Sequence, residues 1–140
     1  MTTEISVHDN FVYAFSVDCE RRKLVLHTAY RDNEPNELTD VVFHDVVAHH
    51  IEHVLPGNIL MDVEEQDLAF VVRENADLFA RSWRYGWPPV KYSGDLASLI
   101  DALQALPARA WSIDASCGLS GWVLATECER VRREQPASVA

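Results

Sequence analysis

Alternation of apolar and polar residues predicts four strands in the first half of the chain. Aromatic and branched side chains occupy every second position over residues 11–17 and 24–30, which is the period of a half-buried strand. The stretch 31–38 is rich in Asp, Asn and Pro, and it predicts a loop before a third strand at 39–47. A fourth alternating run covers residues 59–63.

Residues 48–55 have no single period, and two interpretations remain open. The segment either continues the third strand with a bend or forms one helical turn. Pro56, Gly57 and Asn58 are turn residues and end the segment in both cases.

After residue 66 the apolar positions recur at helical spacing. One stripe consists of Leu68, Val71, Val72, Phe79 and Trp83. Asn75 interrupts this stripe, which otherwise predicts a long amphipathic helix. A competing interpretation makes residues 68–72 a strand and begins the helix near Asn75.

A second helix is predicted by another apolar stripe. Its members are Leu96, Leu99, Ile100, Leu103 and Leu106. Asp95 or Ser93 can cap its N-terminus, and Pro107 ends it. We expect Leu99 and Leu103 to be buried against the sheet.

The C-terminal third predicts a hairpin followed by a tail. Alternation at 111–114 and 122–126 flanks the small, polar turn 116–121. Residues 129–140 lack an apolar face, as do residues 1–8, and both termini are therefore expected to be frayed.

Together these elements predict a single α+β domain over residues 1–140. It contains an antiparallel sheet of about six strands, built from the N-terminal meander and the C-terminal hairpin, with two helices on one face.

The 48% apolar content suffices for a core. The chain shows no run of about 18 apolar residues and no secretory signal, and its three cysteines form no CxxC pair. These features predict a cytoplasmic protein without membrane span, disulfide framework or zinc ribbon.

The net charge of −10 arises entirely in the first half. Residues 1–70 hold 14 acidic and 4 basic residues, whereas residues 71–140 hold 8 of each. Such a potential repels phosphate backbones, which argues against a nucleic-acid partner, and it attracts basic proteins. Solubility alone is the alternative explanation. The candidate contact residues are Asp32, Glu34 and Glu37 in the loop, and Asp62, Glu64 and Glu65 after the fourth strand.

Four of the six histidines gather in one segment: His44, His49, His50 and His53. His49 and His53 face the same way whether the segment is helical or extended, as two ligands of one metal ion must. Glu52, Asp45 or Asp62 could add a carboxylate, although the HEXXH order is absent. The alternatives are hydrogen-bonded surface histidines or a pH-sensitive cluster.

Three further features each have a structural and a chemical interpretation. The acids from Asp62 to Asp67 either perform acid–base chemistry or stabilise the N-terminus of the following helix. Cys117 lies in a turn without the Gly-x-Ser-x-Gly spacing of a nucleophile elbow, so a hairpin turn is the simpler interpretation. The aromatic residues around Trp83 and Trp87 either form a binding surface or close one end of the core.

Five short stretches resemble one kind of protein. They are residues 42–46 (VFHDV), 50–52 (HIE), 57–65 (GNILMDVEE), 86–88 (GWP) and 118–123 (GLSGWV). In this order they resemble immunity proteins of contact-dependent and polymorphic bacterial toxin systems, over most of the chain between residues 40 and 125. The resemblance implies a small, acidic, cytoplasmic and non-enzymatic protein, and it assigns no catalytic residue.

The leading hypothesis is therefore a binding protein without a cofactor that neutralises a basic partner, and the resemblance adds that it is of the immunity type. Its contact residues would be the six acids above together with Trp83 and Trp87. The first alternative is a metal-binding protein or metal-dependent enzyme that uses His49, His53 and Glu52. The second is a small-molecule-binding module with a pocket between sheet and helices.

Overall fold

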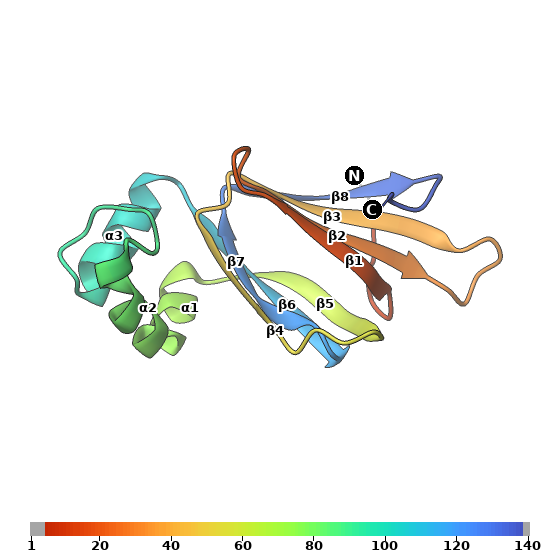
Figure 1. Cartoon of the computed structure of the whole chain (residues 1–140), viewed down its shortest axis with the longest axis horizontal. Helices are drawn as coiled ribbons and strands as arrows, with labels where there is room; N and C mark the ends of the chain where they lie inside the picture. The colour runs from red at the N-terminus through yellow and green to blue at the C-terminus, as the bar shows by residue number, and fades with distance from the viewer. Residues whose placement is uncertain (1–4, 139–140) are drawn as a thin grey trace.

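The computed structural model describes residues 5–138, which form one antiparallel sheet of eight strands, three α-helices and a short 3-10 helix (Figure 1). The strands are β1 (Phe11–Asp18), β2 (Lys23–Tyr30), β3 (Glu37–His44), β4 (Ala48–Glu52), β5 (Asn58–Gln66), β6 (Arg109–Cys117), β7 (Ser120–Ala125) and β8 (Glu127–Arg133). The helices are α1 (Leu68–Glu74), α2 (Ala76–Ser82), the 3-10 helix η1 (Trp83–Tyr85) and α3 (Leu96–Ala105). The predicted α+β class and single antiparallel sheet are confirmed, but six strands and two helices were too few.

The sheet folds into two halves, and its strand order is β4-β7-β6-β5-β1-β2-β3-β8. On one side β1 and β5 join the halves through two residue pairs, Phe11 with Ile59 and Val12 with Asn58, and Leu60 extends this contact by backbone hydrogen bonds with Asp9 and Asn10. On the other side the strands themselves turn a corner. Residues 45–47 connect β3 to β4, and Thr126 alone connects β7 to β8. Because β3 pairs with β8 and β4 pairs with β7, the continuous segments β3–β4 and β7–β8 run side by side from one half of the sheet to the other.

Hydrogen bonds of Thr126 stabilise this corner. Its backbone N–H donates to the carbonyl oxygen of His44 at 3.1 Å, and its hydroxyl donates to Asp45 Oδ2 at 3.0 Å. Asp45 adopts a φ of 52°, a left-handed conformation that aspartate tolerates better than most residues.

The main core fills the space between the two halves of the sheet. Phe43 of β3 is fully buried there, and its ring meets the indole of Trp111 edge-on with centroids 6.0 Å apart. Val7, which precedes β1, is also fully buried in this core. The expectation of a frayed segment 1–8 is therefore wrong for Val7, whereas residues 1–4 lie outside the described residues.

A second core lies between the helices and the outer face of β4, β6 and β7. Strand β7 is buried on both faces, with Trp122 and Leu124 in the second core and Val123 in the main core. Leu99 and Leu103 of α3 are fully buried, as predicted. Asp95 caps this helix by accepting from the N–H of Ser98 at 2.7 Å.

Asn75 divides the long helix predicted from the first stripe. Its Nδ2 donates to the carbonyl oxygen of Val71 at 2.8 Å, and its ψ of 27° lies outside the helical range. This bond satisfies a carbonyl that the last turn of α1 leaves without a helical partner. Asp67 caps α1 by accepting from the N–H of Phe70 at 3.1 Å, so the competing strand at 68–72 is wrong. Trp83, assigned to the buried stripe, is 46% exposed.

Strands β4 and β8 are the two strands that the sequence pattern did not predict. The open segment 48–55 is extended from Ala48 to Glu52, and His53 ends the strand with a φ of 61°. Strand β8 lies in the predicted frayed tail, yet it forms seven residue pairs with β3. Five of its seven residues are charged, as is common in edge strands, and so it shows no apolar alternation. Residues 134–138 follow without regular structure, and 139–140 lie outside the described residues.

Candidate binding groove

A groove of about 620 Å³ lies where the junction of α1 and α2 faces β4, β6 and β7. The strands contribute His50, Glu52, Ile113, Asp114 and residues 120–122, and the helices contribute residues 73–78 and Arg81. Most of these side chains are polar or charged. The groove therefore suits a charged or strongly polar ligand rather than an apolar one.

The strand wall is built around His50 and Trp122, which are cross-strand neighbours of β4 and β7. Their rings stack with centroids 6.2 Å apart and an interplanar angle of 27°. His50 Nε2 lies 3.5 Å from Glu52 Oε2. Gly121 allows β7 to approach β4 closely here, because a Cβ atom at this position would fall 1.8 Å from the carbonyl oxygen of His50.

Trp122 is almost enclosed, with 7% of its surface exposed. Its ring centroid lies 5.6 Å from that of Phe79 and 6.1 Å from that of Trp87. The indole Nε1 has no hydrogen-bond acceptor among residues 5–138. A buried donor without an acceptor is unfavourable, because it has lost its bond to water and gained none.

The helix wall carries a row of charges at four-residue spacing: Arg73, Asp77 and Arg81. All three are exposed. None of the three forms an ion pair with another described residue. The arginines in ion pairs lie elsewhere, in the β1–β2 loop, β6 and β8. The break at Asn75 separates Arg73 from the other two and places the row along the groove.

The structure does not bring the three candidate metal ligands together. His49 and Glu52 lie on opposite faces of β4, because side chains three positions apart in a strand point in opposite directions. His53 lies beyond the strand, and its Nδ1 is 4.0 Å from Glu52 Oε1. Within the described ranges, no group of three His, Cys, Asp or Glu side chains is placed to hold a metal ion.

His49 and His44 each have their own surroundings. His49 is half-buried, and this burial lowers its pKa, an effect to which the neighbouring His50 adds. His44 lies at the corner of the sheet, where its Nε2 is 2.8 Å from Glu129 Oε1 of β8. The cluster seen in the sequence is therefore dispersed over different faces.

Three of the six predicted contact acids have arginine partners within the chain. The pairs are Asp62 with Arg130 at 3.3 Å, Glu37 with Arg132 at 3.5 Å, and Glu65 with Arg109. Arg109 Nε donates to Glu65 Oε2 at 2.8 Å, and this hydrogen bonding lowers the pKa of Glu65. Asp32, Glu34 and Glu64 are exposed and form no ion pair with any described residue.

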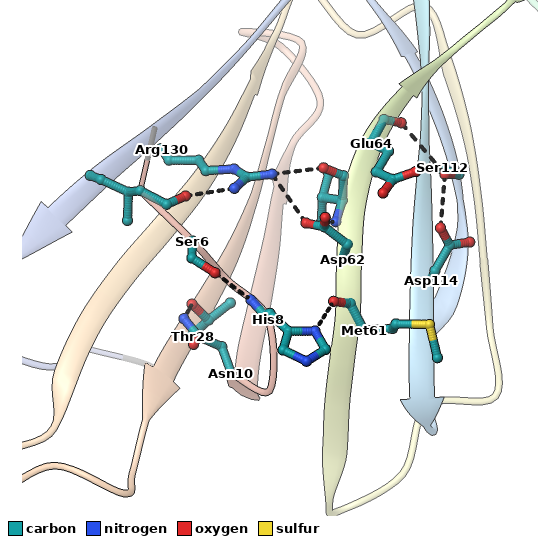
Figure 2. Close-up of polar contacts among 12 residues, drawn as sticks. Ser6, His8, Asn10, Thr28, Met61, Asp62, Glu64, Ser112, Asp114 and Arg130 are labelled. Atoms are coloured by element: carbon teal, nitrogen blue, oxygen red, sulfur yellow. Dashed lines mark hydrogen bonds and ion pairs between the residues drawn. The ribbon is translucent and has the colours of Figure 1, made fainter. Parts of the chain in front are cut away.

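Asp62 belongs to a contact between the two halves of the sheet. Figure 2 shows the guanidinium of Arg130 reaching from β8 to Asp62 on β5. The same guanidinium donates to the carbonyl oxygens of Val63, at 2.7 Å, and Ile5. Beside it, Ser112 donates to Asp114 Oδ2 at 3.2 Å (Figure 2).

The two predicted contact tryptophans occupy different environments. Trp87 is half-buried and stacks on Phe79 with centroids 5.4 Å apart, so it belongs to the second core. Trp83 is accessible, and its ring lies 6.0 Å from that of Tyr92 at the edge of a separate hollow.

A partly buried polar chain that the sequence pattern does not reveal lies on the outer face of β1, β2, β3 and β8. His27 Nδ1 lies 2.9 Å from Asp40 Oδ1, and each side chain is 10% exposed. Arg133 Nη1 donates to Asp40 Oδ2 at 3.0 Å, and Ser16 Oγ lies 3.5 Å from His27 Nε2. Strand register alone brings these residues together, so no spacing in the sequence could reveal them.

The contacts from Ser16 to His27 and from His27 to Asp40 follow the arrangement of a hydrolase triad, but the geometry favours a structural role. The contact between serine and histidine is at the limit of a hydrogen bond, and Arg133 shares the aspartate. These contacts satisfy the buried polar groups of His27 and Asp40, whereas Ser16 is exposed and Arg133 is partly exposed.

Two other sequence features have structural explanations. Asp67 caps α1, so the interpretation of the acidic run as a helix N-terminus holds for this residue alone, because Asp62, Glu64 and Glu65 lie within β5. Cys117 is exposed at the end of β6, and the turn after it connects the antiparallel pair β6 and β7, which confirms the predicted hairpin.

Comparison of the chain with protein-family models, with curated proteins and with solved structures finds no match. Among residues 5–138, no helix has the length and apolar character needed to cross a membrane.

Proposed function

We propose that this chain is a non-enzymatic binding protein whose partner is a protein with a basic surface. The observation that supports it is the distribution of charge after folding. Arginines of β6 and β8 are already paired with acids of β3 and β5. The surplus of ten negative charges is therefore carried by other, exposed carboxylates, among them Asp32, Glu34 and Glu64.

A carboxylate surplus of this kind accelerates association with a basic protein, because long-range attraction steers the encounter. The specific form of the proposal is an immunity protein that neutralises a basic toxin domain in the cytoplasm. The resemblance of residues 40–125 to such proteins supports it. Trp83 adds an accessible aromatic side chain of the type found at interface centres.

Affinity capture tests this proposal, with the untagged chain coupled to a matrix and exposed to a lysate of the organism that encodes it. The expected partner has a basic surface, and its association should slow as the salt concentration rises. If the partner is a toxin domain, co-expression of this chain should abolish its toxicity. A partner with an acidic surface, or association indifferent to salt, would contradict the proposal.

A further inference from the structure

The groove between the α1–α2 junction and β4, β6 and β7 contains charges that the fold does not neutralise. Its carboxylates, on Glu52, Glu74, Asp77 and Asp114, outnumber its guanidinium groups, on Arg73 and Arg81, by four to two. Apart from the contacts of Glu52 with neighbouring histidines, none of these groups forms an ion pair within residues 5–138. The carboxylates of Glu65, Asp62 and Asp40 differ from those of the groove, because each already forms an ion pair with an arginine of β6 or β8.

The strand wall offers two further recognition elements next to these carboxylates. The imidazole of His50, with 39% of its side chain exposed, lies on the indole of Trp122 and provides a flat ring surface. Trp122 is 93% buried and lines the groove, and its Nε1 has no acceptor among the described residues. This N–H is itself enclosed, so a peptide carbonyl becomes its acceptor only where the bound segment reaches it.

A cation fits the carboxylate surplus, and a guanidinium fits it better than an ammonium. It is planar, it can donate two parallel hydrogen bonds to one carboxylate, and it stacks on flat rings. We propose that the groove binds arginine side chains from an extended segment of the basic partner. This inference rests on the proposed function and assigns the docking site to the groove rather than to the acidic loop 31–37.

The first test is a titration of isotope-labelled protein with a short peptide of alternating arginine and glycine, followed by nuclear magnetic resonance. The amide resonances of His50 and Gly121 and the indole N–H resonance of Trp122 should shift. The indole resonance of Trp111 serves as the internal control, because this residue lies in the main core and does not line the groove. A lysine peptide should bind several-fold more weakly, and a glutamate peptide should cause no shift.

The second test compares two double variants that remove the same charge. Glu52→Gln with Asp114→Asn neutralises the strand wall of the groove, and Asp32→Asn with Glu34→Gln neutralises the loop. The groove variant should bind the arginine peptide at least about five-fold more weakly, whereas the loop variant should stay within about two-fold. Thermal melts of both variants should match that of the unmodified protein, because all four side chains are exposed.

The possible outcomes distinguish a failure of the groove assignment from a failure of the proposed function. Shifts centred on residues 31–37, with the larger loss in the loop variant, would overturn the groove assignment and leave a basic partner in place. Equal binding of arginine and glutamate peptides would overturn the groove assignment as well. An acidic partner in the capture experiment, together with no peptide shift at all, would overturn both.

Discussion

The guanidinium of Arg130 lies 3.3 Å from the carboxylate of Asp62 and thereby joins two strands that are not neighbours in the sheet. Strands β1, β2 and β3 separate β5 from β8 in the strand order. Arg130 also donates to the carbonyl oxygens of Val63 and Ile5. The contact therefore connects β8, the edge strand of one half of the sheet, directly to β5 of the other half.

Replacing Arg130 by methionine should lower the free energy of unfolding by about 2–4 kcal/mol, because its side chain is only 12% exposed and its loss removes the hydrogen bonds to Asp62, Val63 and Ile5. Urea unfolding measures the difference. Arg132→Met is the matched control in the same strand. Its pair with Glu37 is about half exposed, so it should change stability by less than about 1 kcal/mol. Equal effects of the two substitutions would refute this role of Arg130.

Leu103 and Leu106 share the predicted stripe of α3 but differ in burial. Leu103 is fully buried in the second core, whereas Leu106, at the C-cap, is 45% exposed. Leu103→Ala should cost about 2–5 kcal/mol of stability, and Leu106→Ala should cost under about 1 kcal/mol. Thermal melts of both variants measure this. A melt of the Leu103 variant that equals the unmodified protein would mean that α3 does not pack as described.

His49 should make the stability depend on pH. Burial lowers its pKa below the ordinary value of 6.5, so the unfolded chain binds more protons than the folded chain between the two pKa values. The contribution of His49 to stability is therefore complete above about pH 6.5 and declines as the pH falls toward the lowered pKa. Urea unfolding between about pH 7 and pH 5 should show a smaller decline in His49→Gln than in the unmodified protein. His53→Gln is the control, since its side chain is 71% exposed beyond β4. Identical profiles for the unmodified protein and His49→Gln would count against this explanation.

The metal alternative leads to a prediction of its own. His49 and Glu52 lie on opposite faces of β4, so protein purified without an affinity tag should carry less than one equivalent of zinc, nickel or iron. Elemental analysis gives the metal content. Stoichiometric metal that disappears in His49→Ala would restore the metal-binding hypothesis.

The amino-acid sequence by itself determined the elements whose signals lie close together in the chain. Alternation located β1, β2 and β5, and the apolar stripe with Asp95 located α3. A strand face repeats every two residues and a cap acts within one helical turn, so each signal is contained in a short segment. The strand was located, but its face was not: a bulge between Val12 and Ala14 shifts the alternation, so Val12 is buried in the main core whereas Val17 is 40% exposed.

Only the tertiary structure decided which distant residues meet. Strand β8 is highly charged, and it becomes a strand because β3 pairs with it. The meeting of Asp62 with Arg130, separated by 68 residues, depends on how the sheet folds over, as the meeting of His27 with Asp40 depends on strand register. The groove arises in the same way, where the break at Asn75 faces strands from both halves of the chain. Charged side chains have no hydrophobic period to reveal such encounters, and the register between strands is set by the whole core rather than by local sequence.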